Sequence, residues 1–112
     1  MFDRIRMKKE LNRNSHINRA LAVECRIQLL EWLIEPDRHF RDRVKRHRQI
    51  RFVAESDIEQ KWNVTRSTAR KHIHLLKAAN LIQVDRLQKT NWIKRNHRGI
   101  AVAQAAGHIY IR

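Results

Sequence analysis

Cysteines, turn-forming residues and long apolar runs are all scarce in this sequence of 112 residues. The single cysteine, Cys25, excludes an intramolecular disulfide and a zinc site built on paired cysteines, which suits a reducing cytosol. Two glycines and one proline favour helices over a sandwich or barrel of many short strands. No apolar run approaches the length of a bilayer span, and the first residues lack the apolar core of a secretory signal. We therefore expect a cytoplasmic protein with no membrane partner.

Acidic side chains are scarce in the second half of the chain. From Gln60 onward, Asp85 is the only acid and stands against eleven Lys and Arg, whereas the first 59 residues hold fourteen basic and ten acidic side chains. This distribution and the net charge of +14 predict a polyanionic partner, most often nucleic acid. The sequence shows no nucleophile paired with a base, no Gly-rich phosphate loop and no carboxylate pair, so we do not expect an enzyme.

The first half of the chain predicts one amphipathic helix and a long basic connector. Apolar residues from Val23 to Ile34 recur at helical spacing. Pro36 should end this helix, because the residue before a proline is pushed out of the α region. The connector His39–Arg51 is basic and has few apolar side chains, so we expect a mobile loop there, followed by a short strand at Arg51–Val53.

The middle of the chain predicts two helices joined by a tight turn. Ser56 and Glu59 have the spacing of a capping box, which indicates the start of the first helix. Asn63 suits the turn, because asparagine tolerates the left-handed region better than most residues. The segment Thr65–Ala79 predicts the second helix, with its threonine as the N-cap and Asn80 at its end. Together the two helices predict a helix-turn-helix over about 56–79.

The last third of the chain predicts a hairpin and a helix. Two short strands over about 81–95, with a turn at Leu87–Lys89, form the expected hairpin. The Ala-rich tail over about 98–109 predicts a helix whose Ile100, Ala103, Ala105 and Ala106 face a partner.

The order of these elements predicts a mainly α protein with a small β-hairpin, an α+β fold of the winged helix-turn-helix type. The length fits one domain, which we expect over 15–112 after a basic N-terminal arm or frayed helix over 1–14. In such a fold the hairpin is the wing beside the second helix.

The second predicted helix has an apolar face and a basic face, and it contains no acid. Its N-terminal residues would approach the bases in the major groove of double-stranded DNA, where Arg and Lys pair with guanine edges. The hairpin would contact the flanking phosphates. The residues that we expect to contact DNA are Thr65, Arg66, Ser67, Thr68, Arg70, Lys71, His74 and Lys77 on the helix, and Arg86, Lys89 and Lys94 on the hairpin.

Three stretches of the sequence resemble the arsenic-repressor (ArsR/SmtB) winged-helix family. Ala20–Leu30 resembles the family's opening pattern, Asp57–Ile82 resembles its helix-turn-helix, and Trp92–Arg95 resembles the end of its wing. The resemblance implies a homodimer, held by the N- and C-terminal helices, that binds an inverted repeat in an operator and associates with the nucleoid. Many members are repressors released by a metal or another effector. The cysteine pairs and the C-terminal ligand spacing of the family's metal sites are missing here, so we expect no metal, no cofactor and no evident effector.

Other interpretations of the same features stay open. The net charge exceeds what operator binding needs, so a nonspecific architectural DNA-binding protein or an RNA-binding winged helix is the alternative. His72 and His74 lie two residues apart on a helix, point to different faces and cannot chelate one metal together. Arg26 would lower the pKa of Cys25, as in a redox switch, but we favour an inert, packed thiol.

Overall fold

The computed structural model describes residues 16–17, 20, 23–40, 44–47 and 50–107. The predicted arm over 1–14 and the end of the predicted C-terminal helix, 108–109, lie outside the described residues.

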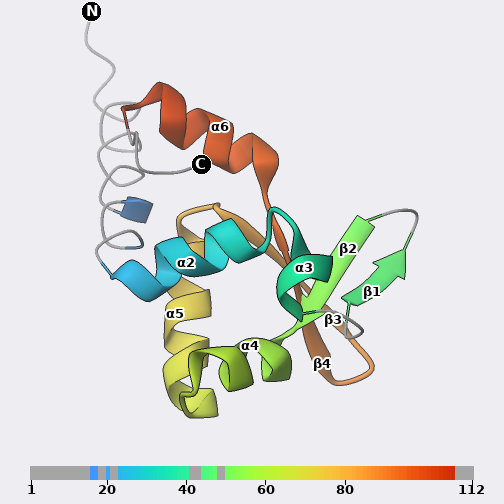
Figure 1. Cartoon of the computed structure of the whole chain (residues 1–112). Helices are drawn as coiled ribbons and strands as arrows, with labels where there is room; N and C mark the ends of the chain where they lie inside the picture. Colours follow the sequence, from blue (N-terminus) through green and yellow to red (C-terminus); the bar gives the residue numbers. More distant parts are fainter. Residues whose placement is uncertain (1–15, 18–19, 21–22, 41–43, 48–49, 108–112) are drawn as a thin grey trace, which may run out of the picture.

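Figure 1 shows the arrangement of the elements. In chain order they are α2 (Glu24–Trp32), α3 (Pro36–Phe40), β1 (Val44–His47), β2 (Ile50–Ala54), α4 (Glu55–Trp62), α5 (Arg66–Ala78), β3 (Ile82–Leu87), β4 (Thr90–Arg95) and α6 (His97–Ala105). The predicted winged helix-turn-helix is confirmed, with α4 and α5 as the two helices and β3–β4 as the wing.

The strands form one antiparallel sheet in the order β1-β2-β4-β3. Ile93 of β4 pairs with Val53 of β2 on one side and with Val84 of β3 on the other. Ala54 ends β2 opposite Trp92, so the chain enters α4 on the side of the sheet where the β3–β4 turn lies. The β1–β2 hairpin therefore ends at the opposite end of the sheet, as Figure 1 also shows.

The mobile loop predicted for His39–Arg51 is wrong for the part that the structure describes. The segment instead contains the end of α3, all of β1 and the start of β2, which pair as an antiparallel hairpin. Buried side chains at Phe40 and Val53 attach both ends of this segment to the core, and pairing with β4 supplies backbone partners for β2. The predicted strand at Arg51–Val53 is confirmed as part of β2. Pro36 begins α3, a position that its fixed φ favours.

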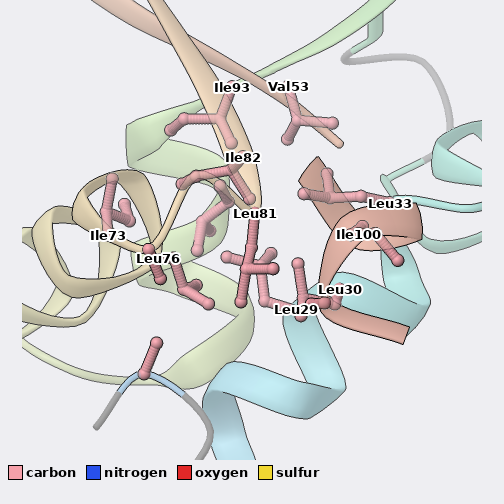
Figure 2. Close-up of a cluster of buried hydrophobic side chains, with 14 of the residues drawn as sticks. Leu29, Leu30, Leu33, Val53, Ile73, Leu76, Leu81, Ile82, Ile93 and Ile100 are labelled. Atoms are coloured by element: carbon pink, nitrogen blue, oxygen red, sulfur yellow. The ribbon is translucent and has the colours of Figure 1, made fainter. Parts of the chain in front are cut away.

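A single apolar core joins the helices to the sheet (Figure 2). The labelled side chains come from α2 and its C-cap, from β2, from α5 and its link to the wing, from β3 and β4, and from α6. They are Leu29, Leu30, Leu33, Val53, Ile73, Leu76, Leu81, Ile82, Ile93 and Ile100. The predicted apolar face of the first helix is wrong at its ends, because Val23 is 37% exposed and Ile34 is 46% exposed. The helix stops at Trp32, so Ile34 lies beyond it and no longer shares its buried face.

The ends of the helix-turn-helix helices follow the sequence at three of four positions. Asn63 and Asn80 both have left-handed backbone angles, with φ of 57° and 63°, and end α4 and α5 as predicted. Thr65 caps α5 and accepts a hydrogen bond from the Thr68 amide at 3.3 Å. The predicted cap at Ser56 is wrong, since β2 continues directly into α4 and Ala54 takes the N-cap position without a side-chain bond.

The predicted orientation of the C-terminal helix also needs correction. Ile100 and Ala103 of α6 are buried in the chain's own core and do not face a partner. Asn96 caps α6 and donates to the Asn80 carbonyl at 3.0 Å, which fixes the start of α6 against the end of α5. Gly99 is required at this contact, because a Cβ atom there would overlap the Asn80 carbonyl oxygen.

A half-buried polar cluster connects α2 to the flank of α5. Arg26 donates from Nε to Nδ1 of His72 at 2.8 Å, and Trp62 donates from its indole nitrogen to the Cys25 carbonyl at 3.2 Å. The rings of Trp62 and His72 also meet edge to face, at a centroid distance of 5.4 Å. Burial raises the pKa of the Cys25 thiol and outweighs the lowering by Arg26. A thiol with a raised pKa is a poor nucleophile, in keeping with an inert cysteine.

Neutral His72 fits this cluster better than the protonated form. Burial is the largest cause that lowers the pKa of His72, and the positive charges of Arg26 and Lys71 lower it further. The Nδ1 atom must also stay unprotonated to accept the hydrogen bond from Arg26. The cluster therefore holds α5 against α2 while His72 is neutral.

We predict that His72 makes the folded protein sensitive to mild acid. Because its pKa is lowered on folding, the unfolded chain takes up the proton first, so the free energy of unfolding falls as the pH drops below the ordinary value of 6.5. His72→Asn should remove this dependence, since asparagine offers Arg26 an oxygen acceptor that does not titrate. Urea unfolding at a series of pH values measures the effect. The exposed change His74→Asn should keep the parent's dependence, and an unaltered dependence in His72→Asn would contradict the assignment.

Candidate nucleic-acid interface

The two faces predicted for the second helix are present in α5. Ala69, Ile73 and Leu76 are buried, whereas all eight helix residues proposed for DNA contact are exposed. Those exposed residues are Thr65, Arg66, Ser67, Thr68, Arg70, Lys71, His74 and Lys77. The N-terminal end of α5 and the β3–β4 turn both lie along the lower side of the molecule in Figure 1. We call the exposed face of α5 together with the wing the basic surface.

The wing places its three proposed residues in different surroundings. Lys89 is exposed at the β3–β4 turn, and Arg86 is exposed on β3. Lys94 is half-buried on β4, and its Nζ lies 5.3 Å from the centre of the Phe52 ring. This cation–π contact holds Lys94 along the sheet, away from the tip of the wing.

The wing turn is made of two residues with left-handed backbone angles. Gln88 has φ of 50° and Lys89 has φ of 67°. Two-residue hairpin turns with positive φ at both positions match the twist of the strands and usually contain Asn and Gly. A residue with a Cβ in this region costs about 1 kcal/mol or more. The turn therefore keeps a lysine at the tip at some cost in stability.

Glu55 connects α5 to the wing. Its side chain is 9% exposed, and Oε1 accepts from Nε of Arg70 at 3.3 Å. Oε2 accepts from Nδ2 of Asn91 on β4 at 2.8 Å, and Oδ1 of Asn91 accepts from Arg86 on β3 at 3.4 Å. A continuous chain of polar contacts thus runs from α5 through the start of α4 to both strands of the wing.

Sequence reasoning missed Glu55 and Asn91 because their partners are distant in the chain. Glu55 lies 15 residues before Arg70 and 36 residues before Asn91. An acid in the first turn of a helix is ordinary, since the helix N-terminus carries partial positive charge. The one signal available was that Glu55 directly follows an apolar strand, where a buried side chain is expected.

Arg66 has a looser acidic partner than Arg70. Its Nε lies 3.7 Å from Oε1 of Glu59, and its side chain is 70% exposed. An exposed pair of this length contributes little to stability because water screens it. The guanidinium group of Arg66 therefore remains accessible to another partner.

Arg95 at the end of the wing has a structural role. It is buried, and its Nη1 donates to the Leu30 carbonyl at 2.6 Å. Burial lowers the pKa of this guanidinium, and Glu31 opposes the shift. The contact fastens the base of β4 to α2, so the basic side chains that remain available on the wing are those nearer its tip.

The described part of the chain shows no group of three or more His, Cys, Asp or Glu side chains arranged to hold a metal ion. Within the same residues, no helix has both the length and the apolar character needed to cross a membrane.

A curated bacterial relative shares much of this sequence. The uncharacterized HTH-type transcriptional regulator YbzH of Bacillus subtilis (strain 168) is 38% identical over 82 residues, which cover 73% of this chain and 82% of the relative. No protein-family model matches the chain.

Solved structures of transcriptional regulators share the fold. The crystal structure of the ArsR family transcriptional regulator RHA00566 has a TM-score of 0.65 at 16% identity, covering 85% of this chain and 82% of that one. The homodimeric winged helix-turn-helix DNA-binding domain of Mb0332 from Mycobacterium bovis, a possible ArsR-family transcriptional regulator, has a TM-score of 0.66 at 18% identity, covering 97% of this chain and 85% of that one. The relative YbzH is a transcriptional regulator, a class without enzymatic activity, in agreement with the sequence. The chain belongs to the DNA-binding HTH-type transcriptional regulators, with the winged-helix fold of the ArsR-type regulators that its sequence resembles.

Proposed function

We propose that this chain is a sequence-specific repressor that reads an inverted repeat in double-stranded DNA as a homodimer. The observation that carries the proposal is the exposed face of α5, which presents five basic or histidine side chains and three hydroxyl-bearing residues without one acid. An α-helix fits the major groove, and the N-terminal residues of the second helix of such a motif approach the base edges. The wing beside α5 supplies further positive charge for the phosphates.

The basic surface divides into base contacts and phosphate contacts. Arg66 and Arg70 are proposed to read bases because they lie in the first turns of α5, where hydroxyls of Ser67 and Thr68 also reach the groove. The remaining residues are proposed to contact phosphates and so to set the register of the protein on the duplex. They are Thr65, Lys71, His74 and Lys77 on the helix and Arg86, Lys89 and Lys94 on the wing.

Exposed apolar residues on α6 support the homodimer. Val102 is 45% exposed, and Ala101, Ala105 and Ala106 are exposed beside it, while the opposite side of the helix is buried in the core. A two-fold dimer uses the same patch of both copies, so α6 can pack against its own symmetry mate. The homodimeric winged helix of Mb0332 has the same fold. Two recognition helices related by a two-fold axis read an inverted repeat.

Repression follows in this proposal from occupation of an operator that overlaps a promoter. A regulator of this kind acts in the cytoplasm at the nucleoid. No effector is part of the proposal.

We predict that the preferred duplex loses its advantage when Arg66 or Arg70 is truncated. The duplex is first selected from a random pool with the parent protein, and anisotropy then compares it with bulk DNA at physiological salt. A specific regulator should prefer it by about 10³-fold or more. Arg66→Ala and Arg70→Ala should each reduce that preference about 5- to 150-fold, the effect of losing one good base contact.

The control for these variants is Arg38→Ala. It removes the same charge from an exposed side chain that lies outside the basic surface, and it should keep the preference. The proposal is wrong if Arg70→Ala prefers the selected duplex as strongly as the parent does. A parent that enriches no sequence, or that binds RNA in preference, would instead identify a nonspecific architectural protein or an RNA-binding winged helix.

We predict opposite effects of Lys89→Gly on stability and on binding. Glycine adopts the positive φ of this turn without strain, so the free energy of unfolding should rise by about 1 kcal/mol. Binding to every duplex should weaken, and the slope of log affinity against log salt should decrease by about one. Gln88→Gly is the matched control, because it relieves the same strain in the same turn without removing a charge. Equal salt slopes for the two variants would show that Lys89 contacts no phosphate.

A further inference from the structure

The hydrogen bond between Glu55 and Arg70 can hold the arginine side chain in one orientation. The carboxylate is fixed from two sides, by Nε of Arg70 at 3.3 Å and by Nδ2 of Asn91 at 2.8 Å. Asn91 in turn is held by β4 and accepts from Arg86. The carboxylate therefore cannot follow Arg70 if the arginine moves, because its second oxygen belongs to the wing.

The hydrogen bond at Nε leaves the two terminal nitrogens of Arg70 available. A guanidinium has five N–H donors in a rigid planar fork, and only the Nε side of Arg70 is hydrogen-bonded to Glu55. The Arg70 side chain is still 55% exposed. The two terminal nitrogens form the edge that pairs with O6 and N7 of guanine.

Fixing Arg70 before binding changes what binding costs. A free arginine side chain has many rotamers, and most of that freedom is lost when the side chain is held against a base. When Glu55 already restricts the side chain, less of that entropy remains to be lost, and wrong orientations that reach only phosphate are disfavoured.

The charge of Glu55 also points to selection among sequences. A carboxylate beside the basic surface repels DNA phosphates of every sequence and so lowers general affinity. Burying it costs solvation, which its two hydrogen-bonded partners offset. An acid at this place is unfavourable for a surface that only has to attract a polyanion.

We infer that Glu55, held by Asn91, is a positioning residue that orients Arg70 to read one guanine in each half-site. The inference rests on the proposed function, because it assigns a base to one residue of the proposed basic surface. Glu55 touches no base itself and acts through Arg70.

The test uses Glu55→Gln in the full chain, on the duplex selected by the parent and on duplexes with one G·C pair changed at a time. The variant keeps the size of the side chain and removes the charge. Its affinity for bulk DNA should equal or exceed that of the parent, since one negative charge is gone. Its preference for guanine should fall about fivefold or more, at the one position per half-site where Arg70→Ala also loses preference. Adding Glu55→Gln to Arg70→Ala should cause no further loss at that position.

A merely structural role would give a different result. If Glu55→Gln unfolds more easily yet keeps the parent's preference at every base pair, the inference is overturned while the proposed function stands. If the parent selects no sequence at all, the proposed function fails together with the inference.

Asn91→Ala provides a second route to the same answer. It leaves the Glu55–Arg70 contact in place and frees the other carboxylate oxygen, so the preference for the same guanine should fall by a smaller factor. Since it retains Glu55, it stays usable if Glu55→Gln does not fold. An unchanged preference in folded Asn91→Ala, with Glu55→Gln unfolded, would also overturn the inference.

Discussion

Burial of the apolar face of α5 determines which side chains of this helix are exposed to DNA. Ala69, Ile73 and Leu76 pack into the core beneath the helix, and each is nearly or fully excluded from solvent. Because a helix has a fixed period, burying these residues turns the basic residues between them outward. The cap at Thr65 and the left-handed end at Asn80 then fix where that exposed face begins and ends.

The exposed face of α5 is basic, yet two of its arginines lie beside carboxylates of α4. Arg70 and Arg66 each lie against a carboxylate, from Glu55 and Glu59, at the start and the last turns of α4. Positive charge without acidic partners would raise affinity for all DNA alike. The wing is coupled to this arrangement through Asn91, so α5 and the wing form one connected surface. The proposed specificity depends on that connection more than on the total charge.

Local signals in the sequence were enough to predict the helix-turn-helix and the wing. Asn63 and Thr65 act through their own backbone and nearest neighbours, so their roles were visible from the sequence. The errors arose where distant contacts decide. Ser56 does not cap α4, because β2 continues directly into this helix and Ala54 takes the N-cap position. The expected mobile loop is a hairpin in the structure, because β2 pairs with β4. Glu55 could not be predicted for the same reason, since its partners come from α5 and from the wing.

A crystal structure of the protein on its selected duplex would test the role of Arg70 and the basic surface most directly. We predict two recognition helices in successive major grooves, with the terminal nitrogens of Arg70 on a guanine and its Nε still bonded to Glu55. We also predict Lys89 beside a phosphate that flanks each half-site. A complex in which α5 lies outside the groove would contradict the assignment of the basic surface, and one in which Arg70 leaves Glu55 for a phosphate would contradict its role in reading sequence.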